Sequence, residues 1–114
     1  MKPQKHIISN AILFATQKHN GQFDRGGMPY ILHPLKVSHY LKTDDEELMA
    51  IAVLHDTVED CFDDPEVGYQ ELKEVGMTVR VIEGVKCLTK VKDETYEEYI
   101  QKVLTNPDSI KVKM

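Results

Sequence analysis

The densest group of reactive side chains in the sequence is the segment HDTVED at residues 55–60. It follows an apolar run, residues 48–54 (LMAIAVL), whose hydrophobic side chains recur with the three- and four-residue spacing of a helix. On one continuous helix, His55 and Glu59 lie four residues apart and share a face near its end. Imidazole and carboxylate groups at the end of a buried helix are unfavourable unless they are paired or bind a metal. We therefore predict that the function lies here, in a metal-binding or acid–base site.

The two acidic residues that end this segment are expected at the C-terminal end of the same helix. Acidic side chains there oppose the helix dipole, and this unfavourable placement favours a functional role for Glu59 and Asp60 over a solvated helix end. For the histidines elsewhere, ordinary structural roles are favoured. His19 is expected as a helix C-cap, and His6 and His39 as surface residues.

The elements that must position this segment are helices joined by short loops. Residues 5–19 carry an apolar stripe of helical spacing, which Leu13 and Phe14 widen, and Gly21 is suited to closing the helix. Three further helices are predicted in the middle of the chain: one with Pro34 in its first turn, one after the cap at residues 43–45, and one around residues 67–75 that ends before Gly76. A fourth follows Thr78 and has Val79, Ile82 and Val85 in the core. Two more follow the capping box Thr95–Glu98 and Pro107. The expected fold class is all-α, with six or seven helices.

The composition is that of one globular domain covering residues 1–114, with 41% hydrophobic and 29% charged residues. A net charge of −5 and a pI near 5.5 argue against a nucleic-acid or membrane-surface partner, although a local metal ion can still attract an anionic substrate. No apolar run reaches the length of a membrane span, and no signal-peptide pattern is present. Cys61 and Cys87 lack metal-type spacing, so we expect reduced thiols in a cytoplasmic protein.

Four segments of the sequence occur in the order typical of one known family: residues 15–22 (ATQKHNGQ), 27–35 (GMPYILHPL), 54–60 (LHDTVED) and 84–90 (GVKCLTK). With them, the chain resembles the HD-domain metal-dependent phosphohydrolases. More narrowly, it resembles the RelA/SpoT-type hydrolase domain and the small alarmone hydrolases. A histidine–aspartate pair alone is weak evidence, whereas the second and third segments together are a strong signal.

The resemblance implies an all-α fold that holds one divalent ion, usually Mn²⁺, with His33, His55 and Asp56 as ligands and Glu59 and Asp60 as catalytic residues. The implied substrate is guanosine 3′,5′-bis(diphosphate) or its triphosphate analogue, which loses its 3′-diphosphate as pyrophosphate. The chemistry agrees, because a mixed nitrogen and oxygen donor set suits Mn²⁺, Fe²⁺ or Zn²⁺ better than Ca²⁺. Such an ion polarises a phosphoryl oxygen and lowers the pKa of a bound water from ~15.7 toward ~7.

Three further residues are candidates for substrate binding. Arg25 and Lys90 are loop cations that can contact phosphate or nucleotide, and Tyr30 can line the pocket. The alternative for the two cations is simple exposure to solvent.

Two departures from the family pattern keep other functions open. The family has a further metal-ligand Asp beyond the segment that matches residues 110–114, so the chain is expected to lack the family's C-terminal helices and fourth ligand. The loop at residues 23–25 is less basic than in characterised alarmone hydrolases. The alternatives are an HD-type hydrolase of another nucleotide, or a catalytically impaired fragment or binding module.

A shortened last helix is also expected to expose the apolar partners of Ile110 and Val112, which favours a homo-oligomer.

Overall fold

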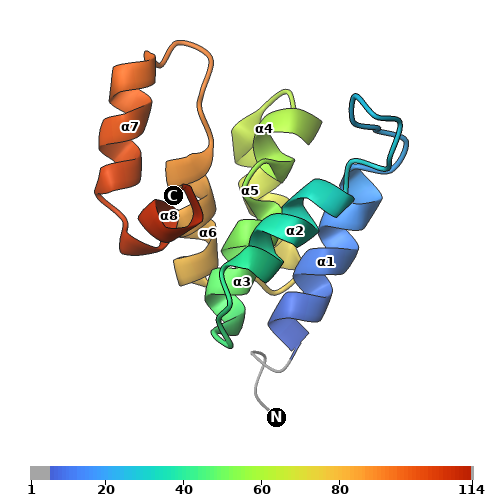
Figure 1. The fold of residues 1–114 in the computed structure, drawn as a ribbon. Helices are drawn as coiled ribbons and strands as arrows, with labels where there is room; N and C mark the ends of the chain where they lie inside the picture. The colour runs from blue at the N-terminus through green and yellow to red at the C-terminus, as the bar shows by residue number, and fades with distance from the viewer. Residues whose placement is uncertain (1–5, 114) are drawn as a thin grey trace.

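The computed structural model describes residues 6–113, and within this range the chain forms eight helices (Figure 1). They are α1 (Ile7–Lys18), α2 (Leu32–Tyr40), α3 (Glu46–Leu54), α4 (Thr57–Cys61), α5 (Pro65–Glu74), α6 (Val79–Leu88), α7 (Tyr96–Leu104) and α8 (Pro107–Lys113). The predicted all-α class is confirmed, and among the described residues the only β-type pairing is an isolated bridge between Phe23 and Pro29. The predicted helix start at residue 5 lies outside the described residues. No helix in the described range is long and apolar enough to cross a membrane.

Helix α3 is the centre of the molecule. All five residues from Ala50 to Leu54 are completely buried, and α1, α2, α6 and α8 contact this helix (Figure 1). Its start is fixed by Asp45, whose Oδ1 accepts hydrogen bonds from the backbone N–H groups of Glu47 and Leu48 at 3.1 and 3.3 Å. The apolar run of the sequence thus forms a helix that is packed on several sides, and this packing fixes the position of the residues that follow Leu54.

The prediction of one continuous helix through residues 48–60 is wrong, because the chain breaks between α3 and α4. His55 keeps helical angles, but Asp56 has φ −121° and ψ 4°, and α4 begins at Thr57. Asp56 makes no side-chain capping hydrogen bond at this break. Its carboxylate accepts a hydrogen bond from the Tyr30 hydroxyl, and the Thr57 hydroxyl lies 3.2 Å from His19 Nε2, so both side chains are held by other parts of the fold. Glu59 and Asp60 therefore lie in the first turn of α4 and not at the C-terminal end of a long helix. The dipole argument for these two acids thus does not apply.

Helix α6 packs against α3 through part of the predicted face, because Val85 is buried as predicted and Ile82 is half-buried against the core, but Val79 is not. Val79 was expected in the core but is 77% exposed, whereas Val81, Val85 and Leu88 are buried with four- and three-residue spacing. Val79 follows the Thr78 cap as the first residue of the helix, so it points away from the core. A Cβ atom on Gly84 would lie 2.6 Å from Ile51 Cδ1, so this glycine sets the close approach of the two helices. Leu13 of α1, also expected to widen an apolar stripe, is likewise 58% exposed.

One arginine ties the start of α3 to α6 and α8. The guanidinium of Arg80 donates hydrogen bonds to Asp45 at 2.8 Å, to Asp108 at 2.8 Å and to Glu47 at 3.2 Å. The hydrogen bonds from Arg80 hold the pKa of the Asp45 carboxyl below its usual range. The network joins helices that are distant in sequence, and it does so at the end of α3 remote from His55.

The variant Arg80→Gln should lower the free energy of unfolding by about 1–2 kcal/mol at neutral pH, because three carboxylates lose a shared, partly exposed cation. The lowered pKa of Asp45 contributes stability above the unfolded-state pKa, and this contribution is lost as the pH falls through the folded-state value. The difference between the two proteins should therefore be full above about pH 5 and shrink below about pH 4. Urea unfolding across this pH range measures it. Arg25→Gln, on an exposed loop, is the matched control, and equal losses in both variants would contradict the prediction.

Candidate metal and catalytic site

Two histidines and one aspartate come together where α3 ends. His33 Nδ1 or Nε2, one ring nitrogen of His55 and one carboxylate oxygen of Asp56 all lie within 4.8 Å of one another. His33 comes from the first turn of α2, and the other two come from the turn between α3 and α4. The two imidazole rings are 5.6 Å apart between centroids. Residues separated by more than twenty positions are thus brought within reach of one ion.

The ring of His55 is oriented by its own helix. Nδ1 lies 2.6 Å from the carbonyl oxygen of Ala52. Because a carbonyl oxygen only accepts, Nδ1 must carry the proton, which leaves Nε2 as a free lone pair. That nitrogen lies 3.6 Å from Asp56 Oδ2. A backbone carbonyl that fixes one ring nitrogen while the other faces a donor cluster is the usual arrangement of a metal-bound histidine.

Asp56 is the most constrained group of the site. Its Oδ2 accepts a hydrogen bond from the Tyr30 hydroxyl, and burial together with this carboxylate raises the pKa of the tyrosine well above its usual range. Its Oδ1 is buried and has no hydrogen-bond partner among residues 6–113. A buried carboxylate oxygen without a partner is unfavourable, and a bound cation would remove that penalty. The donor set and this oxygen therefore fit a divalent ion, for which His33, His55 and Asp56 are the ligands available.

His19 is a site residue that the sequence analysis missed. It does cap α1, as expected, but its side chain is 2% exposed and lies beneath Asp56. Its Nδ1 donates to Gln22 Oε1 at 2.9 Å, and its Nε2 lies 3.2 Å from the Thr57 hydroxyl oxygen. Nε2 is also 3.7 Å from Asp56 Oδ1. The signal available in the sequence was the position of His19 inside one of the four family-like segments, because spacing alone does not bring α1 to α4.

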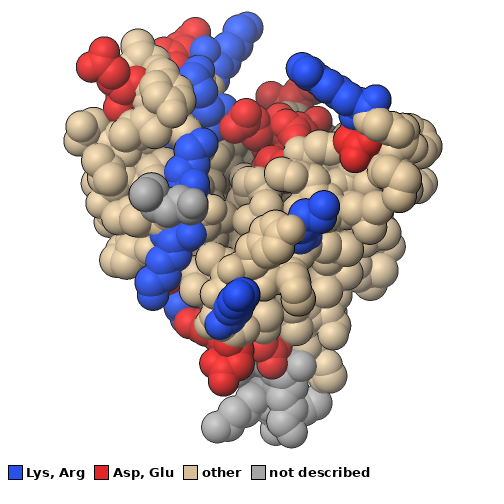
Figure 2. Space-filling model, viewed as in Figure 1, with Lys and Arg blue, Asp and Glu red and all other residues tan. Residues whose placement is uncertain are grey.

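The two acids predicted to be catalytic lie on α4, close to this cluster. Glu59 Oε1 accepts a hydrogen bond from the backbone N–H of Lys90 at 2.8 Å, which fixes one of its oxygens. Partial desolvation, followed by the charges of Asp56 and Glu59, raises the pKa of Asp60 above its usual range. Figure 2 shows acidic side chains gathered in a hollow near α4, with basic side chains on either side. Glu59 is thus fixed through one of its oxygens, while Asp60 has a raised pKa.

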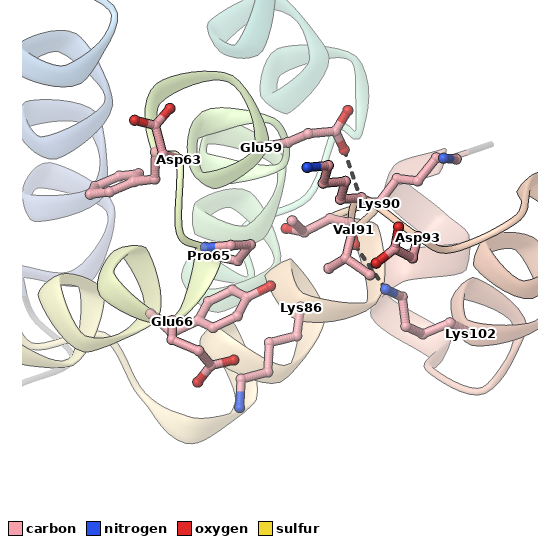
Figure 3. A pocket seen from close by; sticks show the side chains of 13 residues that line it. Glu59, Asp63, Pro65, Glu66, Lys86, Lys90, Val91, Asp93 and Lys102 are labelled. Atoms are coloured by element: carbon pink, nitrogen blue, oxygen red, sulfur yellow. Dashed lines mark hydrogen bonds between the residues drawn. The ribbon is translucent and has the colours of Figure 1, made fainter.

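The three predicted substrate residues have different positions. Tyr30 contacts Asp56 and packs at 5.6 Å between ring centroids from His33. Lys90 lines a cavity of about 660 Å³ that Glu59 borders (Figure 3). Arg25 is exposed on the loop between α1 and α2 and forms no ion pair within the described part of the chain. The neighbouring Asp24 accepts hydrogen bonds from two backbone N–H groups of this loop at 2.8 and 3.0 Å, so it shapes the turn.

A fold of helices around α3, with two histidines and an aspartate at its end, defines the class of the protein. The family model described as an HD domain matches residues 11–110, so the chain belongs to the HD-domain family. It is 37% identical over 111 residues to guanosine-3′,5′-bis(diphosphate) 3′-pyrophosphohydrolase of Aquifex aeolicus, covering 92% of this chain and 15% of that protein. It is 39% identical over 90 residues to the enzyme of the same name from Haemophilus influenzae, covering 75% and 13%.

A plant protein is similar as well. The chain is 35% identical over 96 residues to a putative chloroplastic GTP diphosphokinase of Oryza sativa, covering 80% of the chain and 10% of that protein. The chain thus spans between 10% and 15% of the length of these three relatives.

Removing one ligand should abolish metal retention. We expect the purified protein to bind one divalent transition-metal ion per chain, and His55→Ala to bind none, because two remaining ligands hold such an ion weakly. Plasma mass spectrometry after dialysis measures the content. His39→Ala, at an exposed position of α2, should retain the ion. Equal metal content in all three proteins would place the ion elsewhere.

The hydroxyl of Tyr30 should matter for metal affinity without being a ligand itself. Tyr30→Phe removes the only hydrogen bond to Asp56 Oδ2 within residues 6–113 and frees the carboxylate to rotate. We expect the dissociation constant of Mn²⁺ to rise roughly tenfold, as for other groups that orient metal ligands. Calorimetric titration measures it, with the exposed Tyr96→Phe as a control that should leave the constant unchanged.

Proposed function

We propose that this chain is a divalent-metal-dependent phosphohydrolase that acts on guanosine 3′,5′-bis(diphosphate) or its triphosphate analogue and releases pyrophosphate. One observation carries the proposal: a carboxylate oxygen of Asp56 forms one donor cluster with His33 and His55, and the second acid-rich segment of the site, Glu59 and Asp60, follows directly on α4. The names of the relatives from Aquifex aeolicus and Haemophilus influenzae support the choice of substrate.

We propose Mn²⁺ as the ion, because two imidazoles and a carboxylate form a donor set of intermediate hardness. When bound, the ion supplies Lewis-acid activation of the phosphoryl group and lowers the pKa of water. Tyr30 and His19 keep the Asp56 carboxylate in place, and the Ala52 carbonyl keeps the His55 ring turned toward it. A rigid arrangement of this kind reduces the reorganisation needed during the reaction.

The two acids of α4 divide the proton transfers in this proposal. Water attacks the phosphorus bonded to the ribose O3′ and loses a proton to Glu59, whose second oxygen is not held by Lys90. The bond from phosphorus to O3′ breaks, and O3′ takes a proton from Asp60. The raised pKa of Asp60 suits it to be the donor. The products are guanosine 5′-diphosphate, or the 5′-triphosphate from the analogue, with a free 3′-hydroxyl, and pyrophosphate, which contains the oxygen of the water.

The substitutions Glu59→Gln and Asp60→Asn should each lower the turnover rate about 10²–10⁴-fold, while the metal content stays at the wild-type level. The rate is measured by chromatography of the nucleotide products together with a pyrophosphate assay. Glu97→Gln, in the exposed first turn of α7, is the matched control and should keep full activity. A metal-loaded wild-type protein that releases no pyrophosphate from the guanosine substrate would sink the proposal.

Hydrolysis of another nucleotide is the second candidate function. It is favoured by the loop around Arg25, which presents one cation in place of a basic cluster. A panel of nucleotides that differ in base and in the 3′-group separates the two candidates. A role in the stringent response, a cytoplasmic location and self-association stay predictions, and light scattering at high protein concentration checks the last of them.

A further inference from the structure

A cavity of about 660 Å³ lies beside Glu59, on the side of α4 that faces α6 and α7 (Figure 3). Its walls come from α4, the start of α5, the end of α6, the loop after α6 and α7. Its lining includes Phe62, Pro65 and Tyr69 together with four lysines. This volume is within the range of roughly 300–1,000 Å³ that is typical of sites for small ligands.

Two of the four lysines are already paired. Lys102 Nζ donates to Glu94 Oε1 at 3.0 Å, and Lys86 Nζ lies 3.7 Å from Glu83 Oε2. Lys90 and Lys92 form no ion pair within residues 6–113. In Figure 3 the side chain of Lys90 extends from the loop toward α4, next to Glu59. The cavity therefore has a cation outside any described ion pair at the end that adjoins the proposed catalytic site, with Glu59 as its acidic neighbour.

The loop that carries Lys90 is fixed in place by the protein itself. The backbone N–H of Lys90 donates to Glu59 at 2.8 Å, and the carbonyl of Thr89 accepts from Lys102 Nζ at 2.8 Å. One residue earlier, the carbonyl of Leu88 accepts from the Tyr99 hydroxyl at 3.1 Å. These hydrogen bonds come from two helices, α4 and α7, so the backbone position of Lys90 does not depend on a ligand. A fixed backbone limits the region that the Lys90 ammonium group can reach, so less conformational entropy is lost when it binds an anion.

The carboxylates of the cavity are spread out. In Figure 3, Glu66 lies next to Lys86, Asp93 lies near Lys102, and Asp63 lies at the opposite side from Asp93. Lysines and carboxylates are equal in number along the lining, so the cavity as a whole is not strongly basic. The free positive charge is local and belongs to Lys90 and Lys92. A ligand matched to this pattern carries its negative charge at one end, as a phosphate group does.

We propose that this end of the cavity binds the diphosphate that the reaction releases, with its distal phosphate against the Lys90 ammonium group. The assignment rests on the proposed function. There, the phosphorus next to O3′ is attacked near Glu59, and the second phosphate of the 3′-diphosphate must extend away from the ribose. The cavity begins at Glu59 and provides the free cation in that direction. Lys92 adds charge at the rim, and the product pyrophosphate leaves through the open side.

The first test uses inorganic pyrophosphate and the whole chain without added metal. Titration followed by amide NMR should shift the backbone signals of residues 89–93, and the fit gives a dissociation constant. Lys90→Gln should raise this constant about five- to tenfold, because one charge-assisted contact at a partly exposed site is lost. Lys73→Gln, an exposed cation of α5 outside the cavity, is the matched control and should change it less than twofold. Lys90→Gln retains the backbone N–H that binds Glu59, so folding should be preserved.

The second test measures product inhibition. If the cavity binds the leaving diphosphate, Lys90→Gln should raise the inhibition constant of pyrophosphate by the same factor as the dissociation constant. Turnover of the substrate together with pyrophosphate-induced shifts outside residues 89–93, or equal effects of the two lysine variants, would overturn the assignment. Lys90-dependent binding of pyrophosphate without any turnover would support the anion site and would contradict the proposed function alone. The two hypotheses therefore fail in different ways.

Discussion

A single buried oxygen, Asp56 Oδ1, is the point on which the arrangement of this molecule depends. It has no hydrogen-bond partner within residues 6–113, yet the other oxygen of the same carboxylate is held by Tyr30. Keeping a carboxylate in this state is unfavourable by itself, and a cation shared with His33 and His55 is the compensation that the geometry provides. The surrounding residues therefore do not neutralise the Asp56 carboxylate but hold it in one orientation, near His33 and His55.

The fold makes this possible because the site is assembled at the end of its most rigid element. Helix α3 is buried along its last five residues, and Gly84 lets α6 approach it at a distance that no side chain would allow. Arg80 fixes the opposite end of α3 to α6 and α8. With both ends of the helix held, the turn at residues 55–56 has little freedom to shift. The positions of the three candidate ligands then follow from the packing of a hydrophobic core that contains none of them.

The break between α3 and α4 also determines the electrostatics. It starts a new helix directly after Asp56, so Glu59 and Asp60 lie in a short helix of five residues and not at the C-terminal end of a long one. The short helix turns Glu59 toward the loop after α6, where the Lys90 backbone holds it. Glu59 therefore belongs both to the candidate catalytic site and to the lining of the 660 Å³ cavity. A chain with a net charge of −5 can in this way present cations next to its acidic centre.

The sequence by itself determined the helical class, the capping residues and the segment that carries the chemistry, because these depend on local spacing and on residue types. The capping box at Thr95 and Glu98 and the cap at Thr78 are examples, and both are formed as predicted. The helix break at Asp56, the burial of His19 and the exposure of Val79 were decided only by the tertiary structure. Each of these depends on which helix covers which face, and periodicity does not contain that information. The grouping of His33 with His55 followed from family resemblance in the sequence, but its physical cause is the packing of α2 on α3.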